Sequence, residues 1–396
     1  MKPDWWPGAD HERFTEWALS QGIEVNGVSP ARFPGRGLGM IATRNIEEDE
    51  AIVIVPLKAM LTIERVPASF TSRFPAGTAV HAIVAAFLTN GDAADLRAYE
   101  LWRKTWPSRQ DFEDSMPILW PSSLRGPDGQ APGATVLPPS ISGAWNTITK
   151  RKIEHEYETP HQNLLPQQEK RLQQAWDSVV AVFPDTDWES FSYHWLIVNT
   201  RCFYYLMPGE EPPEDSNDAM AMLPFADYFN HSDVACNVKF DGEKYVFRAT
   251  KHYDGFYLDK NESEMLYLDD IIFQDLSPDL HEELNFQQYY GNYQVTAEGA
   301  CYRTEIAACM KYMALDDWRN YALGYSTKGV DAGKTAAVIK EWIATYANEA
   351  RTATSLLKSA TSDAQDPKNQ EKLDWLLKRW RQIEDLCKTA IDAVVC

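Results

Sequence analysis

The N-terminal part of the chain begins with apolar residues at helical spacing and continues with short apolar runs. Residues 11–22 place Phe14, Trp17 and Ala18 on one face at helical spacing, and Gly22 is a typical helix end. The apolar runs after Gly22 last only a few residues and are separated by turn residues, which is typical of short strands. The pattern therefore predicts one helix followed by strands over 23–25, 38–43 and 51–55.

From about residue 78 to residue 205 the apolar positions recur mainly at helical spacing. A stretch rich in Pro, Gly and Ser at 121–143 interrupts this pattern and predicts a loop. This part of the chain is therefore expected to be a helical insert. The helices predicted in it cover residues 81–88, 99–106, 112–120, 144–158, 166–183 and 188–205.

Strand patterns return after a polar, Pro-rich loop at 206–218. The runs 235–240 and 245–250 are joined by Asp241-Gly242, a dipeptide that favours a tight hairpin turn. Because strand patterns occur on both sides of the helical insert, we expect one sheet domain to be assembled from two separated parts of the chain.

The C-terminal part of the chain has helical patterns again, and those over 334–358 and 369–394 predict a long antiparallel helix pair. The predicted fold class is α+β: short strands in small sheets, a helical insert and an all-helical C-terminal domain. The predicted domain boundaries are 1–75 and 189–258 for the two parts of the strand-rich domain, 76–188 for the insert and 259–396 for the C-terminal domain.

The charge balance of the chain indicates which kinds of partner it can bind. Its 396 residues contain 58 Asp and Glu against 38 Lys and Arg, which gives a net charge of −20. A general nucleic-acid-binding protein needs a basic surface, so direct nucleic-acid binding is not expected. An acidic protein is suited to receive a basic segment of another protein, although solubility alone explains the charge equally well.

The spacing of the cysteines indicates whether the chain binds a metal and in which compartment it lies. The length of the apolar runs indicates whether it enters a membrane. None of the cysteines form a C-x-x-C pair, so no metal site is predicted, and their scatter indicates free thiols in a reducing compartment. The N-terminus has no apolar leader pattern, and no apolar run is long enough to span a bilayer. We therefore expect a cytoplasmic or nuclear protein that does not enter a membrane. The six cysteines are Cys202, Cys236, Cys301, Cys309, Cys387 and Cys396.

A glycine-rich segment, Gly35-Arg36-Gly37-Leu38-Gly39, precedes one of the predicted strands. Glycines allow positive φ angles and a close approach of the backbone to a ligand, so the segment suits an amino-acid-like group. A tight turn between strands is the alternative reading. The segment lacks the spacing and the βαβ context of a dinucleotide-binding loop, so NAD binding is not supported.

Two polar features lie further along the chain. Asn230 and His231 end the segment Leu223–His231, and both side chains can hydrogen-bond an adenine edge or simply hold a turn. Arg201 lies in a largely apolar, aromatic run, and a buried arginine needs an anion. That anion is either Asp227 or the carboxylate of a ligand, and the sequence leaves both open.

Taken together and in this order, these features resemble the SET-domain protein methyltransferase family. The closest resemblance is to the branch that is similar to plant Rubisco large-subunit lysine methyltransferase. It continues through Gly291-Asn292-Tyr293 and 301–307, which look like the Rubisco methyltransferase-type substrate-binding domain of that branch. The resemblance covers nearly the whole chain, and the glycine segment and Asn230-His231 are its most specific parts.

The resemblance implies a cofactor, S-adenosylmethionine, and a set of residues that contact it. Arg36, Gly37 and Leu38 would contact the cofactor mostly through backbone atoms, Arg201 would meet its carboxylate, and Asn230 and His231 would hold its adenine end. The positions at which the family lines its substrate site are Arg201, Tyr205 and Asp227, with Tyr205 in place of a basic residue.

The chain departs from the family pattern where the catalytic tyrosine is expected. In the family, this tyrosine follows the hairpin and orients the amine that receives the methyl group. Here Asp254 is followed directly by Gly255, and a block of about two dozen residues is absent. Tyr253 and Tyr257 flank the junction, but a substitute must match position as well as chemistry. The catalytic residue therefore stays unknown, and either a natural loss or a wrongly joined reading frame explains the gap.

Three functions follow from these observations. The first is an S-adenosylmethionine-dependent protein-lysine N-methyltransferase that acts on a basic segment of a non-histone protein. The second is a non-catalytic SET-like interaction module, because the tyrosine segment is missing. The third is a protein-histidine methyltransferase, since an imidazole needs less deprotonation than a lysine amine at neutral pH.

Overall fold

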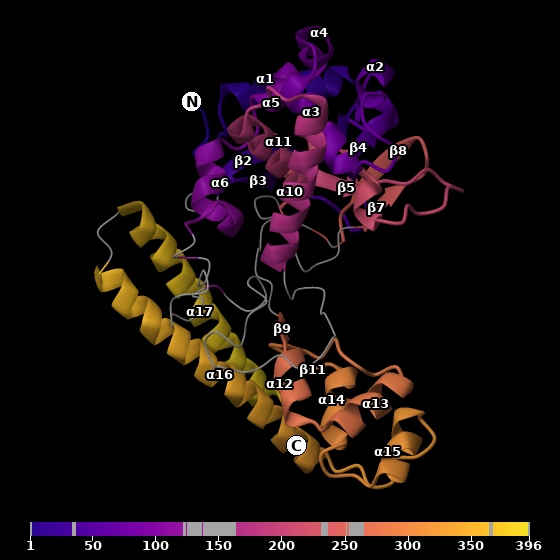
Figure 1. Cartoon of the computed structure of the whole chain (residues 1–396), viewed down its shortest axis with the longest axis vertical. Coiled ribbons are helices and arrows are strands. Elements are labelled where there is room, and N and C mark those ends of the chain that lie inside the picture. Colours follow the sequence, from indigo (N-terminus) through magenta and orange to yellow (C-terminus); the bar gives the residue numbers. More distant parts are fainter. Residues whose placement is uncertain are drawn as a thin grey trace. The chain divides into compact units, whose positions relative to one another are not determined.

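The computed structural model describes residues 2–33, 37–121, 124, 137, 164–230, 237–250, 252, 265–363 and 367–394. The chain forms two compact units (Figure 1). Unit 1 consists of Met1–Phe112 and Lys170–Ser263, and unit 2 consists of Glu113–Glu169 and Glu264–Cys396. The predicted fold class, helices combined with short strands in small sheets, is confirmed. The finer domain boundaries at residues 75, 188 and 258 stay a prediction.

The main sheet of unit 1 joins strands from both sides of the helical insert. Its order is β1 (Glu24–Val25), β4 (Ala51–Pro56), β8 (Lys244–Arg248) and β7 (Asn237–Phe240), with antiparallel neighbours throughout. The pairing of β4 with β8 confirms that two separated parts of the chain form one sheet. The hairpin between β7 and β8 turns at Gly242, whose φ is 97°.

Two small sheets accompany the main sheet in unit 1. β2 (Val28–Phe33) pairs with β3 (Gly37–Ala42), and β5 (Cys202–Tyr204) pairs with β6 (Met220–Met222). β2 was not predicted, because Pro30 inside it is typical of a turn. A proline is tolerated in β2 because the strand pairs on one side only. The helix predicted over 188–205 was too long, since it ends at Arg201 and the aromatic residues after it form β5.

Helices from the start and the end of the predicted insert pack together in unit 1. α3 (Val80–Asn90) packs against α11 (Trp188–Arg201), and Asp187 caps α11 by accepting a hydrogen bond from the Ser190 amide at 2.8 Å. The predicted helices over 99–106 and 112–120 are each shorter than expected, and the one over 144–158 lies outside the described residues. The other α-helices among the described residues before unit 2's sheet are α1 (Ala9–Ser20), α2 (Ala68–Thr71), α4 (Ala93–Leu96), α5 (Glu100–Arg103), α6 (Arg109–Ser115) and α10 (Leu164–Val182).

The long C-terminal helices of unit 2 form the predicted pair. α16 (Ala332–Asp363) and α17 (Pro367–Ala393) lie side by side along their length and bury Trp342 and Trp380 (Figure 1). The C-terminal part is not purely helical, however, because β9 (Met265–Tyr267), β10 (Gln294–Thr296) and β11 (Gly299–Ala300) form a small antiparallel sheet. The remaining helices are α12 (Asp269–Asp275), α13 (Pro278–Phe286), α14 (Tyr302–Cys309) and α15 (Leu315–Ala322).

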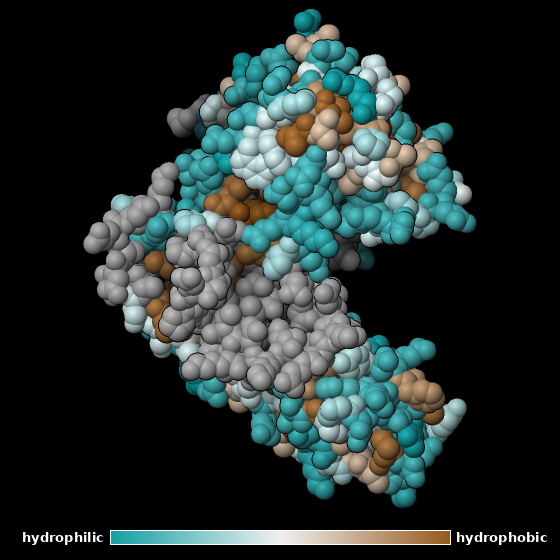
Figure 2. All heavy atoms as spheres, viewed as in Figure 1, coloured by the Kyte–Doolittle hydropathy of each residue, from teal (hydrophilic) through white to brown (hydrophobic). Residues whose placement is uncertain are grey.

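The surface agrees with the acidic, polar composition. The face shown in Figure 2 is mostly hydrophilic on each unit, with separate hydrophobic patches. On unit 2 the most exposed large apolar side chains are those of Phe286 and Tyr325, at 81% and 77% exposure. Within the described part of the chain, no helix has both the length and the apolar character needed to cross a membrane.

Candidate functional site

The glycine-rich segment and the Asn230 segment meet in unit 1 although they are far apart in the sequence. The Asn230 side-chain amide donates from Nδ2 to the Leu38 carbonyl oxygen at 3.0 Å, across 192 positions of the chain. Gly37 begins β3 with a φ of 81°, a backbone conformation that favours glycine. The structure therefore brings together Gly37, Leu38 and Asn230. Arg36 and His231, predicted for the same site, lie outside the described residues.

A buried aromatic cluster fixes the segment that ends at Asn230. Phe225 adopts a φ of 73°, which turns the chain into a short 3-10 helix over Ala226–Tyr228. The rings of Phe225 and Tyr228 pack on Phe14 of α1, and the Tyr228 hydroxyl is 2.7 Å from Nδ1 of His11. Because the turn is anchored in the core, Asn230 leaves it at a defined place on the surface.

Arg201 is paired with Asp227, one of the two anions that the sequence left open. Nη1 of Arg201 lies 3.1 Å from Oδ2 of Asp227 and also donates to the Asp227 backbone carbonyl at 3.1 Å. The indole of Trp102 donates from Nε1 to the same Oδ2 at 3.0 Å. The exposed fraction of the Asp227 side chain is 3%, against 19% for Arg201. The structure thus places a buried carboxylate behind a guanidinium that reaches the surface.

The electrostatics of this pair follow from its burial. Burial raises the pKa of Asp227, while the charge of Arg201 and the two side-chain hydrogen bonds act in the opposite direction. Oδ1 of Asp227 and Nε of Arg201 are both buried without a hydrogen-bond partner among the described residues. A buried donor without an acceptor is costly, so the Arg201 Nε–H would gain from an acceptor that reached it.

Tyr205, also predicted for the substrate site, lines a different cavity of about 690 Å³. Its ring packs on Phe240 with 5.3 Å between centroids, and burial raises the pKa of its hydroxyl. Arg201 and Asp227 are not among the residues that line this cavity. The structure therefore joins two of the three predicted substrate-site residues and places the third elsewhere in unit 1.

Trp102 is a member of this cluster that the sequence did not single out. A buried tryptophan N–H needs an acceptor, but the partner of Trp102 lies 125 positions away in the chain. No local pattern could therefore have identified it. Tyr253 and Tyr257, which flank the junction at Asp254-Gly255, lie outside the described residues.

Sequence comparison relates part of the chain to known SET-domain proteins. No protein-family model matches the chain. SET domain-containing protein 4 of Mus musculus is 23% identical over 221 residues, which cover 55% of this chain and 46% of that protein. Ribosomal lysine N-methyltransferase set11 of Schizosaccharomyces pombe is 26% identical over 149 residues, or 32% of this chain and 38% of that protein.

A shorter match, to the actin-histidine N-methyltransferase of Drosophila melanogaster, is 42% identical over 53 residues, or 13% of this chain and 10% of that protein. The chain thus spans about half or less of the length of the relatives that it matches.

Comparison of folds extends the relationship to almost the whole chain. A crystal structure of the SET domain of LSMT, with lysine and AdoHcy bound, superposes with a TM-score of 0.50 at 12% sequence identity. The superposition covers 98% of this chain and 91% of the LSMT chain. At this identity the match shows the fold alone. The chain therefore has the fold of the LSMT SET-domain structure, and part of it is similar in sequence to SET-domain proteins and protein methyltransferases.

Proposed function

We propose that the chain is a protein methyltransferase that uses S-adenosylmethionine and binds it where the Asn230 side chain meets the backbone of Leu38. The observation that carries this proposal is the hydrogen bond of 3.0 Å between Asn230 Nδ2 and the Leu38 carbonyl. It joins the two most specific sequence segments at one place. The LSMT structure with the same fold was determined with AdoHcy bound, which supports the choice of cofactor.

The residues present at this place fit such a cofactor. A Cβ atom added to Gly37 would meet no atom within 4 Å, so a ligand can approach the backbone closely. Asn230 is exposed at the end of its anchored turn. Arg201 supplies a positive charge and an Nε–H that has no partner among the described residues, which suit a carboxylate. When bound, S-adenosylmethionine supplies a methyl group that its sulfonium has already activated.

The residues of this chain would hold and orient the reactants. Asp227 fixes the guanidinium of Arg201 from behind, so that Arg201 can orient an anionic group without moving. The amide of Asn230 stays in place because its Nδ2 is bound to Leu38. Such positioning lowers the barrier of a transfer reaction by aligning the donor and the acceptor.

We further propose that the acceptor is a lysine of a non-histone protein. A lysine amine has a free pKa of about 10.4 and must lose its proton before it attacks, which a partly apolar channel favours. The relatives named for ribosomal lysine and for actin histidine both act on non-histone proteins, as their names state. The net charge of −20 supports a basic segment around the acceptor.

Binding of the cofactor is tested with Asn230→Ala. We expect the wild-type chain to bind tritiated S-adenosylmethionine in equilibrium dialysis, and N230A to bind it at least about tenfold more weakly, because a charge-neutral hydrogen-bonding group is lost from the site. Asn348→Ala, which changes an exposed asparagine on α16, is the matched control and should bind like the wild type. Failure of the wild-type chain to bind the cofactor would refute the proposal.

Transfer and the identity of the acceptor need a second measurement. We expect incubation of the wild-type chain with labelled cofactor and a histone-free cell extract to label protein, and acid hydrolysis to release methyllysine. N230A should reduce the label to background. Release of methylhistidine instead would exclude lysine as the acceptor. Cofactor binding without transfer to any protein would favour the non-catalytic interaction module, which the missing tyrosine segment suggests.

A further inference from the structure

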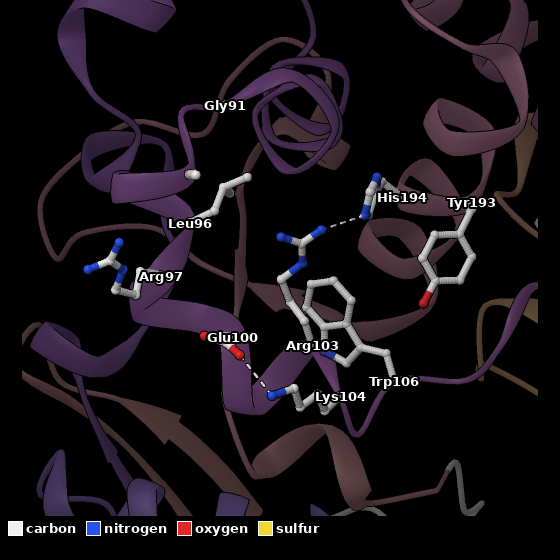
Figure 3. Close-up of a pocket in the computed structure, with 10 residues that line it drawn as sticks. Gly91, Leu96, Arg97, Glu100, Arg103, Lys104, Trp106, Tyr193 and His194 are labelled. Carbon is white, nitrogen blue, oxygen red and sulfur yellow. Dashed lines mark hydrogen bonds and ion pairs between the residues drawn. The ribbon is translucent and has the colours of Figure 1, made fainter.

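A second cavity in unit 1, of about 620 Å³, carries chemistry that the proposed methyl transfer does not use (Figure 3). Its walls come from the segment around α4 and α5 and from α11. None of Leu38, Arg201, Asp227 and Asn230 lines it. The lining side chains on which the argument depends are Arg97, Glu100, Arg103, Lys104, Trp106 and His194.

The cavity has a positive charge balance in a strongly acidic chain. Arg97, Arg103 and Lys104 line the cavity together with one carboxylate, that of Glu100. Glu100 is already paired with Lys104 at 2.8 Å between Oε1 and Nζ, the contact drawn in Figure 3. No ion pair of Arg97 or Arg103 with a carboxylate is found among the residues that line the cavity. On a protein of net charge −20, such a local excess of positive charge points to an anionic ligand.

The surroundings of Arg103 leave its charge without compensation. Its Nη2 donates to the Leu88 carbonyl at 3.4 Å and lies 3.3 Å from Nε2 of His194. Neither of these acceptors is a carboxylate. Arg103 is half-buried, so its guanidinium is only partly solvated, and this burial lowers its pKa. A guanidinium in such a place gains more from an oxyanion than an exposed one does.

The tautomer of His194 fixes this arrangement. The Thr89 hydroxyl donates to the Ala85 carbonyl at 2.7 Å, so it accepts from Nδ1 of His194, 3.0 Å away. Nε2 of His194 then carries the lone pair that accepts from Arg103. Burial lowers the pKa of His194 to about 4, so the ring is neutral at pH 7 and adds no charge. The neutral histidine therefore orients Arg103 by a hydrogen bond and does not neutralise the charge of Arg103, which can pair with a ligand.

The remaining wall suits a flat apolar body. The indole of Trp106 lies beside the Arg103 side chain in Figure 3, and its buried Nε1 has no acceptor among the described residues. Leu96 and the ring of Tyr193 also line the cavity, on either side of Arg103 in Figure 3. A cavity of this volume, mostly apolar with a few convergent donors, is of the kind that holds small organic ligands.

We propose that this cavity binds a small aromatic oxyanion, a carboxylate or a phosphate ester, whose charged group pairs with Arg103 and whose ring lies against Trp106. The guanidinium offers parallel N–H donors to the oxyanion, and Arg97 adds long-range attraction at the rim. The site is independent of the proposed methyl transfer, so each proposal can fail without the other.

The test uses ligand-observed fluorine NMR on the full chain. The probes are 4-fluorobenzoate, 4-fluorophenyl phosphate and the neutral 4-fluorobenzamide. We expect either oxyanion to bind at least about tenfold more tightly than the amide, and its binding to weaken when NaCl is added. The tighter of the two oxyanions identifies the natural charged group. Equal binding of all three probes, or no binding of the oxyanions, would overturn the proposal.

Two variants that should change oxyanion binding in opposite directions test whether the ligand binds in this cavity. Arg103→Gln should remove the preference for the oxyanions, and Glu100→Gln should strengthen their binding by about threefold to tenfold, because the one carboxylate of the cavity is gone. Arg381→Gln, an exposed arginine of unit 2, is the control and should change nothing. If R103Q does not fold, E100Q still tests the proposal, because the Glu100 side chain is exposed and its replacement should not unfold the protein. Unchanged binding by E100Q contradicts the assignment.

Discussion

Replacing Arg201 with methionine should lower the free energy of unfolding of unit 1 by about 3–5 kcal/mol, because it leaves the carboxylate of Asp227 buried without its cation. The Asp227 side chain is 3% exposed, so water cannot take the place of the guanidinium. Trp102 alone would remain to donate to Oδ2. Hydrogen exchange resolved to peptides of α11 and of residues 220–230 measures the loss within unit 1.

The pH dependence of R201M gives this prediction a second readout. Burial already raises the pKa of Asp227 in the wild type, and removal of Arg201 takes away the largest opposing contribution. A carboxyl whose pKa is raised in the folded state stabilises the protein at low pH and destabilises it as the pH rises. The destabilisation of R201M should therefore be smaller at pH 5 than at pH 8.

A double variant separates the loss of the pair from the loss of packing. In Arg201→Met with Asp227→Leu the buried charge is absent, so we expect at least half of the lost stability to return. Arg13→Met, which breaks an exposed ion pair with Asp10 on α1, is the control and should leave protection in unit 1 nearly unchanged. A double variant as unstable as the sum of the two single variants would contradict the explanation.

The same pair shows what the sequence can and cannot reveal about the site. A buried arginine in an aromatic helix indicates that an anion is near, but the identity of the anion depends on tertiary structure. Asp227 lies 26 positions after Arg201, and Trp102, which also contacts it, lies 125 positions before it. The motifs containing Leu38 and Asn230 were recognisable because each is a local pattern, whereas their contact is not.

The fold was predictable where local patterns decide it. The hairpin at Asp241-Gly242 and the helices α16 and α17 follow from turn chemistry and from apolar spacing. β2 was missed because Pro30 argues against a strand unless the strand is known to be an edge. β5 was missed because its aromatic residues continue the helical pattern of α11, and only its pairing with β6 makes it a strand.

The stability of unit 2 should depend on pH through Asp269, the first residue of α12. This side chain is 1% exposed and accepts hydrogen bonds from the backbone amides of Asn292 and Tyr293, at 2.5 Å and 3.2 Å. Asn292 has a φ of 62°, so the carboxyl group holds a strained turn in place. Burial outweighs these two hydrogen bonds and raises the pKa of Asp269 from 3.8 to about 7.

The sign of the effect follows from this raised pKa. Below about pH 4 the carboxyl is protonated in the folded and unfolded states, and its favourable contribution to stability is fully present. As the pH rises towards 7, only the unfolded state ionises freely, so unit 2 loses stability. The difference between 3.8 and about 7 corresponds to at most about 4 kcal/mol, and it levels off above the folded-state pKa.

Asp269→Asn should remove this pH dependence. The asparagine amide is neutral like the protonated carboxyl, but it keeps only one oxygen acceptor, so one of the two backbone amides loses its partner. We therefore expect D269N to be less stable than the wild type near pH 4 by about 1 kcal/mol and to gain on it as the pH rises to 8, as measured by hydrogen exchange of peptides that cover residues 266–276 and 292–296. Asp316→Asn, whose carboxyl is 93% exposed on α15, should leave the wild-type curve unchanged. Parallel curves for D269N and the wild type would show that another group in unit 2 carries the pH dependence.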